Sequence, residues 1–591
     1  MPRLAPKSLR VLGLAACLCM SHRVAADAPR DIQTNQRLWL DGLDVNGTDT
    51  GNGDGTNPGG GAQVTLWKDK SPNGFSAGDA VGYGAASRSY PTYSSNTGVS
   101  CNGINNVLQI SGGIYGVATS VPNSDIFIVA STRSAKTQFL FYTGATTGSA
   151  GNRISANVPN ADNILYWDHG SAGSPGRLTA NWTTSGAQFN RFYVYNFGAT
   201  QGSSQIIVRD GTTLVSATNS AFYSQGANHQ YYICAGDTTQ ASHHDGVIAE
   251  MIVYSRRLNT AEKNILQSYL AAKHANPGGA GTASKYTVVG NFRYFVGGIG
   301  QESDGSVTVG TSAGLTITNG TFLGNGRYLL AGVSSLAPAT GTVAADAPAG
   351  SAARSQRVWY LQRTGTATGA VTLAFNLAQL GITASTGSTM VLGYRSGTTG
   401  TFSAQATASY TGSGTVSFTA TNPPTGYYVL ATPAPPSPNI VTTLSSAVTS
   451  DSVNSSNFKA IPGARIRMNV VVVNSGTGSA DNNATSVVNP VPAGSRLYLG
   501  DIGGNGSGPV QFTQGTTPSG LSYTFGGLGN TSDSLDFSND AGATWTYTPA
   551  TTPSLTDSAI TAFRIKPSGT FGTGTAPNNP SFSVGYDVIV Q

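Results

Sequence analysis

Short apolar or alternating runs, separated by clusters of Gly, Asn, Ser and Thr, recur along almost the whole chain. Examples are Ile126–Val129, Phe192–Tyr195 and Gln205–Val208. Runs of this length between turn residues are typical of strands in antiparallel sandwiches. Glycine accounts for 76 of 591 residues, which fits many tight turns that need a positive φ. The pattern therefore predicts an all-β, multidomain protein.

One segment has a helical period instead. Asn259 and Glu262 can form a capping box, and residues 276–279 (Asn-Pro-Gly-Gly) would stop the helix. Between them, apolar positions fall on one helical face: Ile265, Leu266, Tyr269 and Leu270. The sequence predicts one helix here.

Two breaks in composition divide the chain. Residues 275–284 are rich in Gly and Ala, and residues 431–438 are rich in Pro, as in a semi-rigid linker. We expect a signal peptide at 1–26, a jelly-roll sandwich with the helix at its end at 27–280, a β-sandwich of unassigned role at 285–430, and an immunoglobulin-like β-sandwich at 438–591.

The N-terminus has the pattern of a secretory signal peptide. Cations precede the apolar run Val11–Met20, and small residues lie before Asp27. This run is too short for a membrane-spanning helix, and no later run approaches ~18 residues. We therefore expect an exported protein without a transmembrane segment. Cys17 follows Leu-Ala-Ala in the manner of a bacterial lipobox, so an outer-membrane lipoprotein acylated at Cys17 is the alternative to release.

The charge of the chain argues against a nucleic-acid partner. Lys and Arg number 32 against 27 Asp and Glu, and four of the cations precede Asp27. The remainder is 28 against 27, so the exported body is close to neutral. Charged residues make up only 10% of the chain, against roughly 25% in ordinary domains. Binding to nucleic acid needs a basic face, which this composition does not predict.

Two cysteines, Cys101 and Cys234, lie in the exported body. In an oxidising compartment they are a candidate disulfide. Two buried, unpaired thiols remain the alternative, because geometry decides pairing. Neither belongs to a CxxC motif, so a zinc site is not expected.

Oxygen-bearing side chains crowd one Gly-rich loop: Asp41, Asp44, Asn46, Asp49, Asn52 and Asp54. Hard oxygen ligands on a flexible loop suit Ca²⁺, so this loop is a candidate calcium site. The spacing does not fit an EF-hand. The alternative is a solvated loop in which Asn and Asp bond to their own backbone.

Histidine and tryptophan give weaker signals. We expect His243, His244 and Asp245 in a solvated loop, and Asp168-His169 in another. Three tryptophans could supply a sugar-stacking platform, although strand aromatics more often belong to the core. One of the three is expected at the surface: Trp67, Trp167 or Trp182.

The sequence contains few of the residue patterns that are typical of catalytic sites. Glutamate occurs only at Glu250, Glu262 and Glu302, whereas a retaining glycosidase needs two carboxylates about 5–5.5 Å apart. We expect Glu250 to face solvent on an alternating strand. Residues 310–314 match G-x-S-x-G, but the following residues resemble a strand instead of the helix that a nucleophile elbow requires. We therefore expect no enzymatic activity.

Residues 538–545 (SNDAGATW) fit the Asp-box pattern of sialidase propeller blades. The motif has a structural role, because Asp540 can cap a hairpin in which Gly542 takes a positive φ. Sialidases carry several copies and this chain has one, so we expect a stabilised hairpin and no propeller.

The first domain resembles the laminin-G-like, concanavalin-A-type jelly rolls of bacterial surface proteins. The resemblance extends from residue 38 to about 275 and rests on the order of four segments before the helix: Leu38–Asp41, Val64–Gly74, Ile164–Gly170 and Gly246–Leu258. It implies a two-sheet jelly roll with the helix as a terminal cover. It also implies binding or adhesion more than catalysis, with carbohydrate ligands in some relatives and calcium often near the ligand edge.

Residues 438–591 resemble the immunoglobulin-like repeat modules of bacterial surface proteins. The segments that carry this resemblance are 460–464, 468–478 and 489–494. Such modules usually act as spacers.

These observations favour an exported bacterial surface or extracellular protein for binding or adhesion. Its jelly roll would bind a glycan or another surface polymer, and the other domains would space it. The alternative is a structural matrix or coat component that self-associates. A carbohydrate-active enzyme is the third and least favoured hypothesis.

Overall fold

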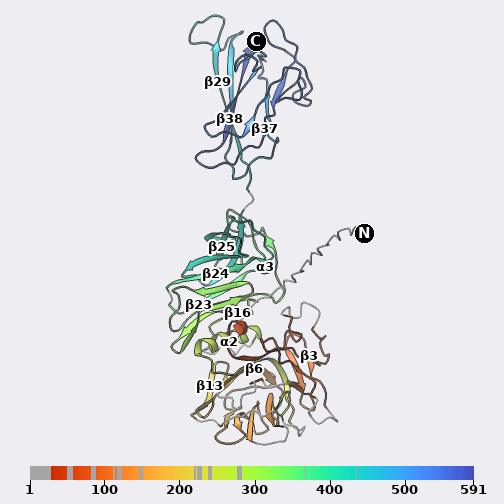
Figure 1. The fold of residues 1–591 in the computed structure, drawn as a ribbon, viewed down its shortest axis with the longest axis vertical. Coiled ribbons are helices and arrows are strands. Elements are labelled where there is room, and N and C mark those ends of the chain that lie inside the picture. Colours follow the sequence, from red (N-terminus) through yellow and green to blue (C-terminus); the bar gives the residue numbers. More distant parts are fainter. Residues whose placement is uncertain are drawn as a thin grey trace, which may run out of the picture. The chain divides into compact units, whose positions relative to one another are not determined.

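The computed structural model describes residues 28–48, 57–80, 88–110, 114–115, 123–145, 151–218, 221, 229–236, 242–275, 283–366, 368–433 and 436–591. The predicted signal peptide and Cys17 lie outside these ranges. The chain forms two compact units, Met1–Pro433 and Ala434–Gln591 (Figure 1). Both are built from antiparallel strands, so the all-β, multidomain prediction is confirmed.

The first sandwich consists of two sheets. Sheet A has the order β13 (Thr212–Ala217), β12 (Ser204–Arg209), β11 (Tyr193–Thr200), β6 (Asn123–Thr132), β15 (Asp245–Tyr254), β4 (Gly98–Asn102) and β3 (Thr92–Ser94), with β1 (Gln36–Asp41) also paired to β15. Sheet B has the order β10 (Arg177–Asn181), β9 (Ile164–Ser171), β8 (Gly151–Asn157), β7 (Phe141–Ala145), β14 (His229–Ile233), β5 (Leu108–Ile110) and β2 (Ala77–Gly78). Alternate residues point inward, and a core that includes Trp67, Trp167 and Phe197 fills the space between the sheets.

The second sandwich follows the same plan. Sheet C has the order β17 (Gly305–Val307), β16 (Tyr294–Glu302), β20 (Arg327–Val333), β23 (Trp359–Thr364), β28 (Gly426–Pro433), β22 (Ser351–Ser355) and β21 (Thr342–Val343), with β25 (Thr389–Arg395) joining β28 to β26 (Ser403–Ser409). Sheet D has the order β18 (Val309–Ser312), β19 (Leu315–Asn319), β24 (Ala370–Asn376) and β27 (Thr415–Thr421), and α3 (Leu377–Leu380) follows β24.

The G-x-S-x-G match lies at a hairpin in sheet D. Strands β18 and β19 pair directly, and Ala313 and Gly314 form the turn with φ values of 46° and 90°. The segment after Ser312 is therefore a strand, as predicted from the sequence.

The long helix α2 (Thr260–Lys273) begins at the predicted capping box. Asn259 Oδ1 accepts a hydrogen bond from the Glu262 backbone N–H, and the Glu262 carboxylate accepts one from the Asn259 N–H, each at 2.9 Å. The helix lies between the outer faces of sheets A and C (Figure 1). Ile265 and Leu266 belong to a buried cluster that also contains Ile252 of sheet A and Leu330 of sheet C. The helix covers the first sandwich, as the resemblance implies, and it also covers the second.

The short helix α1 (Ala28–Asp31) lies at the same junction. Its Asp31 carboxylate accepts hydrogen bonds from the backbone N–H and the hydroxyl of Thr311 in β18, at 2.6 and 2.8 Å. Residues from the start of the first sandwich are thereby joined to the second. None of the described helices is long and apolar enough to cross a membrane.

The second unit is a smaller sandwich. Sheet E has the order β29 (Ile440–Ser450), β30 (Arg465–Asn474), β38 (Ser581–Val590) and β32 (Ser495–Leu497), with β33 (Val510–Gln514) also paired to β38. Sheet F has the order β31 (Val487–Pro490), β36 (Ala562–Ile565) and β35 (Leu535–Ser538), and β34 (Leu521–Ser522) pairs with β37 (Ser568–Gly569).

The Asp-box segment of this unit forms the predicted hairpin turn. Asp540 accepts hydrogen bonds from the Ser538 hydroxyl at 2.6 Å and from the Thr544 backbone N–H at 2.9 Å. These bonds lower the pKa of Asp540 to about 2. Gly542 takes a φ of 90°, and the Trp545 ring lies where a Cβ on Gly542 would approach it to 3.1 Å. The turn is therefore structural in character.

Candidate ligand-binding site

Acidic residues that are far apart in the sequence meet at the C-terminal end of α2. Asp41 of β1 and Glu250 of β15 are direct partners in the strand pairing, so both side chains leave the same face of sheet A. Lys273, the last residue of α2, places its Nζ 2.7 Å from Asp41 Oδ2 and 2.9 Å from Glu250 Oε2. One lysine therefore joins two buried carboxylates.

A second lysine extends this ion network. Lys70 Nζ lies 3.0 Å from Asp41 Oδ2 and 2.8 Å from Asp44 Oδ2. It also lies 4.6 Å from the ring centroid of the buried Trp39, a favourable position for a cation. Asp41 and Asp44, the first two residues of the predicted calcium loop, thus have buried lysine partners: Lys70 for both, and Lys273 for Asp41 as well.

Glu250 has hydrogen bonds to both carboxylate oxygens. Trp39 Nε1 donates to Oε1 at 2.7 Å and the Tyr269 hydroxyl donates to it at 3.0 Å. His274 Nε2 lies 2.6 Å from Oε2. The prediction that Glu250 faces solvent is wrong: α2 covers the outer face of sheet A, and Glu250 is only 1% exposed.

The charges of this network hold one another ionised. Burial raises the pKa of Asp41, but the charges of Lys273 and Lys70 lower it more, and the net value is well below the ordinary one. The pKa of Glu250 is also lowered, because the Lys273 charge outweighs the effect of burial. Burial lowers the pKa of Lys273, whereas Asp41 and Glu250 raise it, and the net pKa is raised. All three groups are therefore charged at neutral pH.

A cavity of about 210 Å³ opens beside the network. Lys273 and His274 form one wall, and both sandwiches contribute the others. From the first come Leu43, Asn96, Thr97 and Phe192, and from the second come Arg293, Tyr294 and Leu336. Among the described residues, the half-buried Arg293 side chain has no hydrogen-bond or ion-pair partner. The cavity thus combines cationic groups with apolar and aromatic surface.

The remaining residues of the predicted calcium loop are only partly described. Asn46 Oδ1 accepts a hydrogen bond from the Thr48 hydroxyl at 3.1 Å. Asp49, Asn52 and Asp54 lie outside the described residues. In the part of the chain that the structure describes, no three His, Cys, Asp or Glu side chains are arranged to hold a metal ion. The calcium site stays a prediction.

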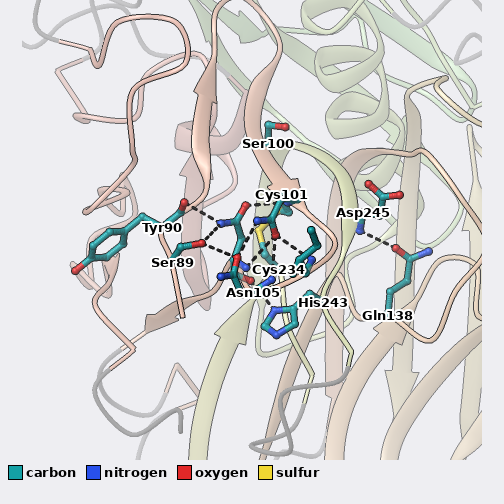
Figure 2. Close-up of a disulfide and its surroundings, with 12 residues drawn as sticks. Ser89, Tyr90, Ser100, Cys101, Asn105, Gln138, Cys234, His243 and Asp245 are labelled. Atoms are coloured by element: carbon teal, nitrogen blue, oxygen red, sulfur yellow. Dashed lines mark hydrogen bonds between the residues drawn. A yellow bond between two sulfur atoms is a disulfide. The ribbon is translucent and has the colours of Figure 1, made fainter. Parts of the chain in front are cut away.

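The predicted disulfide is confirmed. Cys101 of β4 and Cys234, which follows β14, are bonded, with their Cα atoms 5.8 Å apart. The bond joins sheet A to sheet B. Figure 2 shows the polar contacts beside it: His243 Nδ1 lies 2.9 Å from the carbonyl oxygen of Asn106, and Gln138 Oε1 accepts a hydrogen bond from the Asp245 N–H at 2.8 Å.

The histidine predictions are wrong. His243 and His244 are 2% and 0% exposed, because they precede β15 beside the disulfide. His169 is also fully buried and lies within β9. Burial lowers the pKa of His169 and of His244 to about 4. These imidazoles are neutral in the folded protein at physiological pH.

The expected surface tryptophan is absent from the three candidates, which are all buried in the first sandwich. Trp67 Nε1 donates to the Asp41 carbonyl at 3.0 Å, and Trp167 Nε1 donates to the Gly198 carbonyl at 3.2 Å. Trp182 stacks against Phe189 with centroids 5.6 Å apart. Each ring belongs to the core, and none forms a sugar-stacking platform.

The outer face of sheet B carries a separate charged cluster. The buried Asp168 of β9 lies between two arginines, 2.5 Å from Arg153 NH2 and 2.6 Å from Arg177 Nε. The Arg177 guanidinium lies 4.5 Å from the ring centroid of Tyr166. Arg177 keeps 28% of its side chain exposed, so this face is a second polar surface of the first sandwich.

Sequence reasoning missed the cationic residues and the histidine of the candidate site, Lys70, Lys273, Arg293 and His274, and also Asn96 and Tyr294 of the cavity wall. Lys70 adjoins Asp69 in a segment that carries the family resemblance, and Lys273 lies one helical turn after Tyr269. These positions are weak local signals. Nothing in the sequence brings Arg293 of the second sandwich to the end of α2.

No family model matches the chain, and no curated protein matches it. Among solved structures, it is similar to domain 4 of AbnA, a GH43 extracellular arabinanase from Geobacillus stearothermophilus in complex with arabinotriose, with 15% identity, 38% of this chain and 95% of that chain covered, and a TM-score of 0.25. The chain is also similar to the CBM40 of the Ruminococcus gnavus IT-sialidase bound to α2,3 sialyllactose, with 16% identity and a TM-score of 0.21. That match covers 24% of this chain and 80% of that chain. A third similar structure is an SAP-like pentraxin from Limulus polyphemus, with 12% identity and a TM-score of 0.22. That match covers 32% of this chain and 82% of that chain. These values assign neither a family nor a ligand.

Proposed function

We propose that this protein is an exported surface or extracellular protein that binds a glycan without catalysis. Its first sandwich would be a laminin-G-like jelly roll, and its second unit an immunoglobulin-like spacer. The ligand would enter the cavity at the end of α2, where the second sandwich supplies one wall.

The composition of this cavity carries the proposal. A sugar ring has polar edges and an apolar C–H face, and the cavity offers Arg293 and Asn96 together with Tyr294 and Phe192. Binding sites of this kind combine apolar walls with a few polar groups that fix orientation. At about 210 Å³, the cavity is smaller than the ~300 Å³ at which pockets for drug-sized ligands begin. It would take one sugar residue at the end of a chain.

The charge of the walls favours a carboxylate-bearing sugar. Lys273 is already paired with Asp41 and Glu250, whereas Arg293 has no such partner among the described residues. An arginine guanidinium matches the geometry of a carboxylate with two parallel hydrogen bonds. Arg293 would therefore select an acidic residue, such as a uronic or sialic acid.

The same geometry argues against hydrolysis. A glycosidase needs one carboxylic acid that is protonated at the working pH. Asp41 and Glu250 both have lowered pKa values, because lysine charges lie beside them. Neither group would therefore hold the proton that a general acid must deliver.

A glycan array tests the proposal with residues 27–591. Carboxylate-bearing glycans should be retained above their neutral counterparts, without release of reducing sugar. Arg293→Ala should weaken binding by about 10-fold or more, because a hydrogen-bonded charged group contributes ~1.5–3 kcal/mol. Arg177→Ala, on the outer face of sheet B, is the matched control and should bind normally.

Each result has a separate meaning. Binding lost in Arg177→Ala but kept in Arg293→Ala would move the ligand to sheet B, and no retention of any glycan would refute the function. Running the array with Ca²⁺ and with chelator tests the loop from Asp41 to Asp54. Equal binding in both would leave that loop without a calcium role in recognition.

A further inference from the structure

Strand β29 leaves one edge of the second unit unpaired. Within the described residues it bonds only to β30, from Ile440 opposite Asn474 to Ser450 opposite Arg465. It is 11 residues long, and every residue except the half-buried Val448 is exposed. Its sequence, IVTTLSSAVTS, contains no charge, glycine or proline.

Exposed strand edges in natural proteins usually carry a feature that prevents pairing, such as a charge, a proline, a bulge or short length. At the other side of the same sheet, β32 has only 3 residues and includes Arg496. The pairing of β29 is irregular only near its end, between Val448 and Ser450. From Ile440 to Val448 it has none of these features.

The inner face of β29 is apolar and uncovered. Leu444 is opposite Val470 of β30, so its side chain points toward the core side of sheet E, yet it is 62% exposed. Sheet F ends at β31. A groove of about 580 Å³ runs along this opening, lined by Ile440 and Leu444 of β29, Met468 and Val470 of β30, and Val487 of β31 among others.

We propose that β29 pairs with β29 of a second copy of this chain, antiparallel, about a two-fold axis at Leu444. In this register Leu444 is opposite its own copy, and Ile440 is opposite Val448. These side chains leave the inner face together, because residues two apart in a strand share a face. The two strands would make one continuous sheet and place apolar side chains from each copy beside those of the other.

The sequence of β29 favours a second copy over an unrelated partner. An isologous contact brings each residue against a residue of the same strand, so a single charge would meet its own copy at the axis, or would lie beside an uncharged residue at any other position. An uncharged strand avoids this cost at every position. The apolar residues Ile440, Leu444 and Val448 are spaced by four, and this spacing is symmetric about Leu444, so antiparallel pairing matches apolar residues in both directions.

The mass of residues 27–591 in solution tests the pairing. Sedimentation velocity should show a concentration-dependent dimer. Leu444→Lys sets two charges against each other at the axis and should give a monomer. Val453→Lys adds the same charge at a position that is 77% exposed, just after the strand, and should keep the dimer. Because both replaced side chains are exposed, both variants should fold, which circular dichroism checks.

Cysteine cross-linking tests the register. Opposite residues in antiparallel strands lie about 4.5–5.5 Å apart between Cα atoms, within the range for a disulfide. Leu444→Cys should therefore form an intermolecular disulfide under mild oxidation. Thr442→Cys would lie ~13 Å from its copy and should not.

Three results would overturn the proposal: a wild-type chain that is monomeric at all concentrations, a dimer that Leu444→Lys leaves intact, or cross-linking of Thr442→Cys in preference to Leu444→Cys. If the groove instead binds another protein, the isolated wild-type chain would be monomeric at all concentrations.

Discussion

His169 and His244 show how burial changes the chemistry of a single residue. Both were expected in solvated loops, yet both are buried in the first sandwich. Burial lowers the pKa of each to about 4, against about 6.5 in an unfolded chain. Between these values the unfolded chain binds protons that the folded protein does not. Stability must therefore fall as the pH falls through this window.

Urea unfolding of the first unit at pH 7, 6 and 5 should show this loss. Each histidine contributes a slope of up to about 1.4 kcal/mol per pH unit. His244→Gln should remove the contribution of one histidine, so the free energy of unfolding should depend less steeply on pH. The range stops at pH 5 because Asp41 and Glu250, whose pKa values are lowered, would add their own loss at lower pH. An unchanged slope in the variant would mean that His244 titrates normally.

At the scale of elements, α2 was predictable because its signals are local. The capping box and the apolar face lie within the helix itself, and the strands β6 and β12 likewise follow from the short runs Ile126–Val129 and Gln205–Val208. The resemblance implies a covering helix, but nothing in the sequence shows that α2 packs on the face of β15 that carries Glu250, which strand alternation assigns to solvent. The cavity was also beyond prediction, since Arg293 reaches it from the second sandwich. Local patterns thus predicted the elements but not which of them meet.

The ion network that fixes α2 to sheet A makes a stability prediction. Lys273→Met would leave Asp41 and Glu250 buried without their shared partner, which typically costs ~3–5 kcal/mol. Lys263→Met is the matched control on the same helix. Lys263 lies 3.9 Å from Asp125, and Asp125 also has an ion-pair partner in Arg257 at 3.0 Å. Because that partner remains in Lys263→Met, this substitution should cost about 1 kcal/mol or less. Chemical denaturation compares the two, and equal losses would show that Lys273 contributes no more than a surface pair.

At the scale of the whole molecule, composition marks linkers but does not show which domains share a core. The Gly-rich segment at residues 275–284 suggested two independent domains. The two sandwiches do have separate cores, but a third buried cluster around α2 contains residues of both. They lie together in the unit Met1–Pro433, apart from Ala434–Gln591. Because the shared cluster should couple their unfolding, two cooperative transitions are expected instead of three.

Differential scanning calorimetry of residues 27–591 tests this coupling. The enthalpy of unfolding scales with chain length, at about 0.7 kcal/mol per residue near 60 °C, so the larger transition should exceed the smaller by about 2.5-fold. Removing residues 434–591 should abolish the smaller transition and leave the midpoint of the larger one unchanged. Disrupting the third cluster with Leu266→Ala should lower the midpoint temperature of the larger transition. Both sandwiches should then still unfold together in that single transition. A third transition in the wild-type chain would show that the sandwiches unfold independently and that α2 does not couple them. The same conclusion would follow if the larger peak splits in two once residues 434–591 are removed.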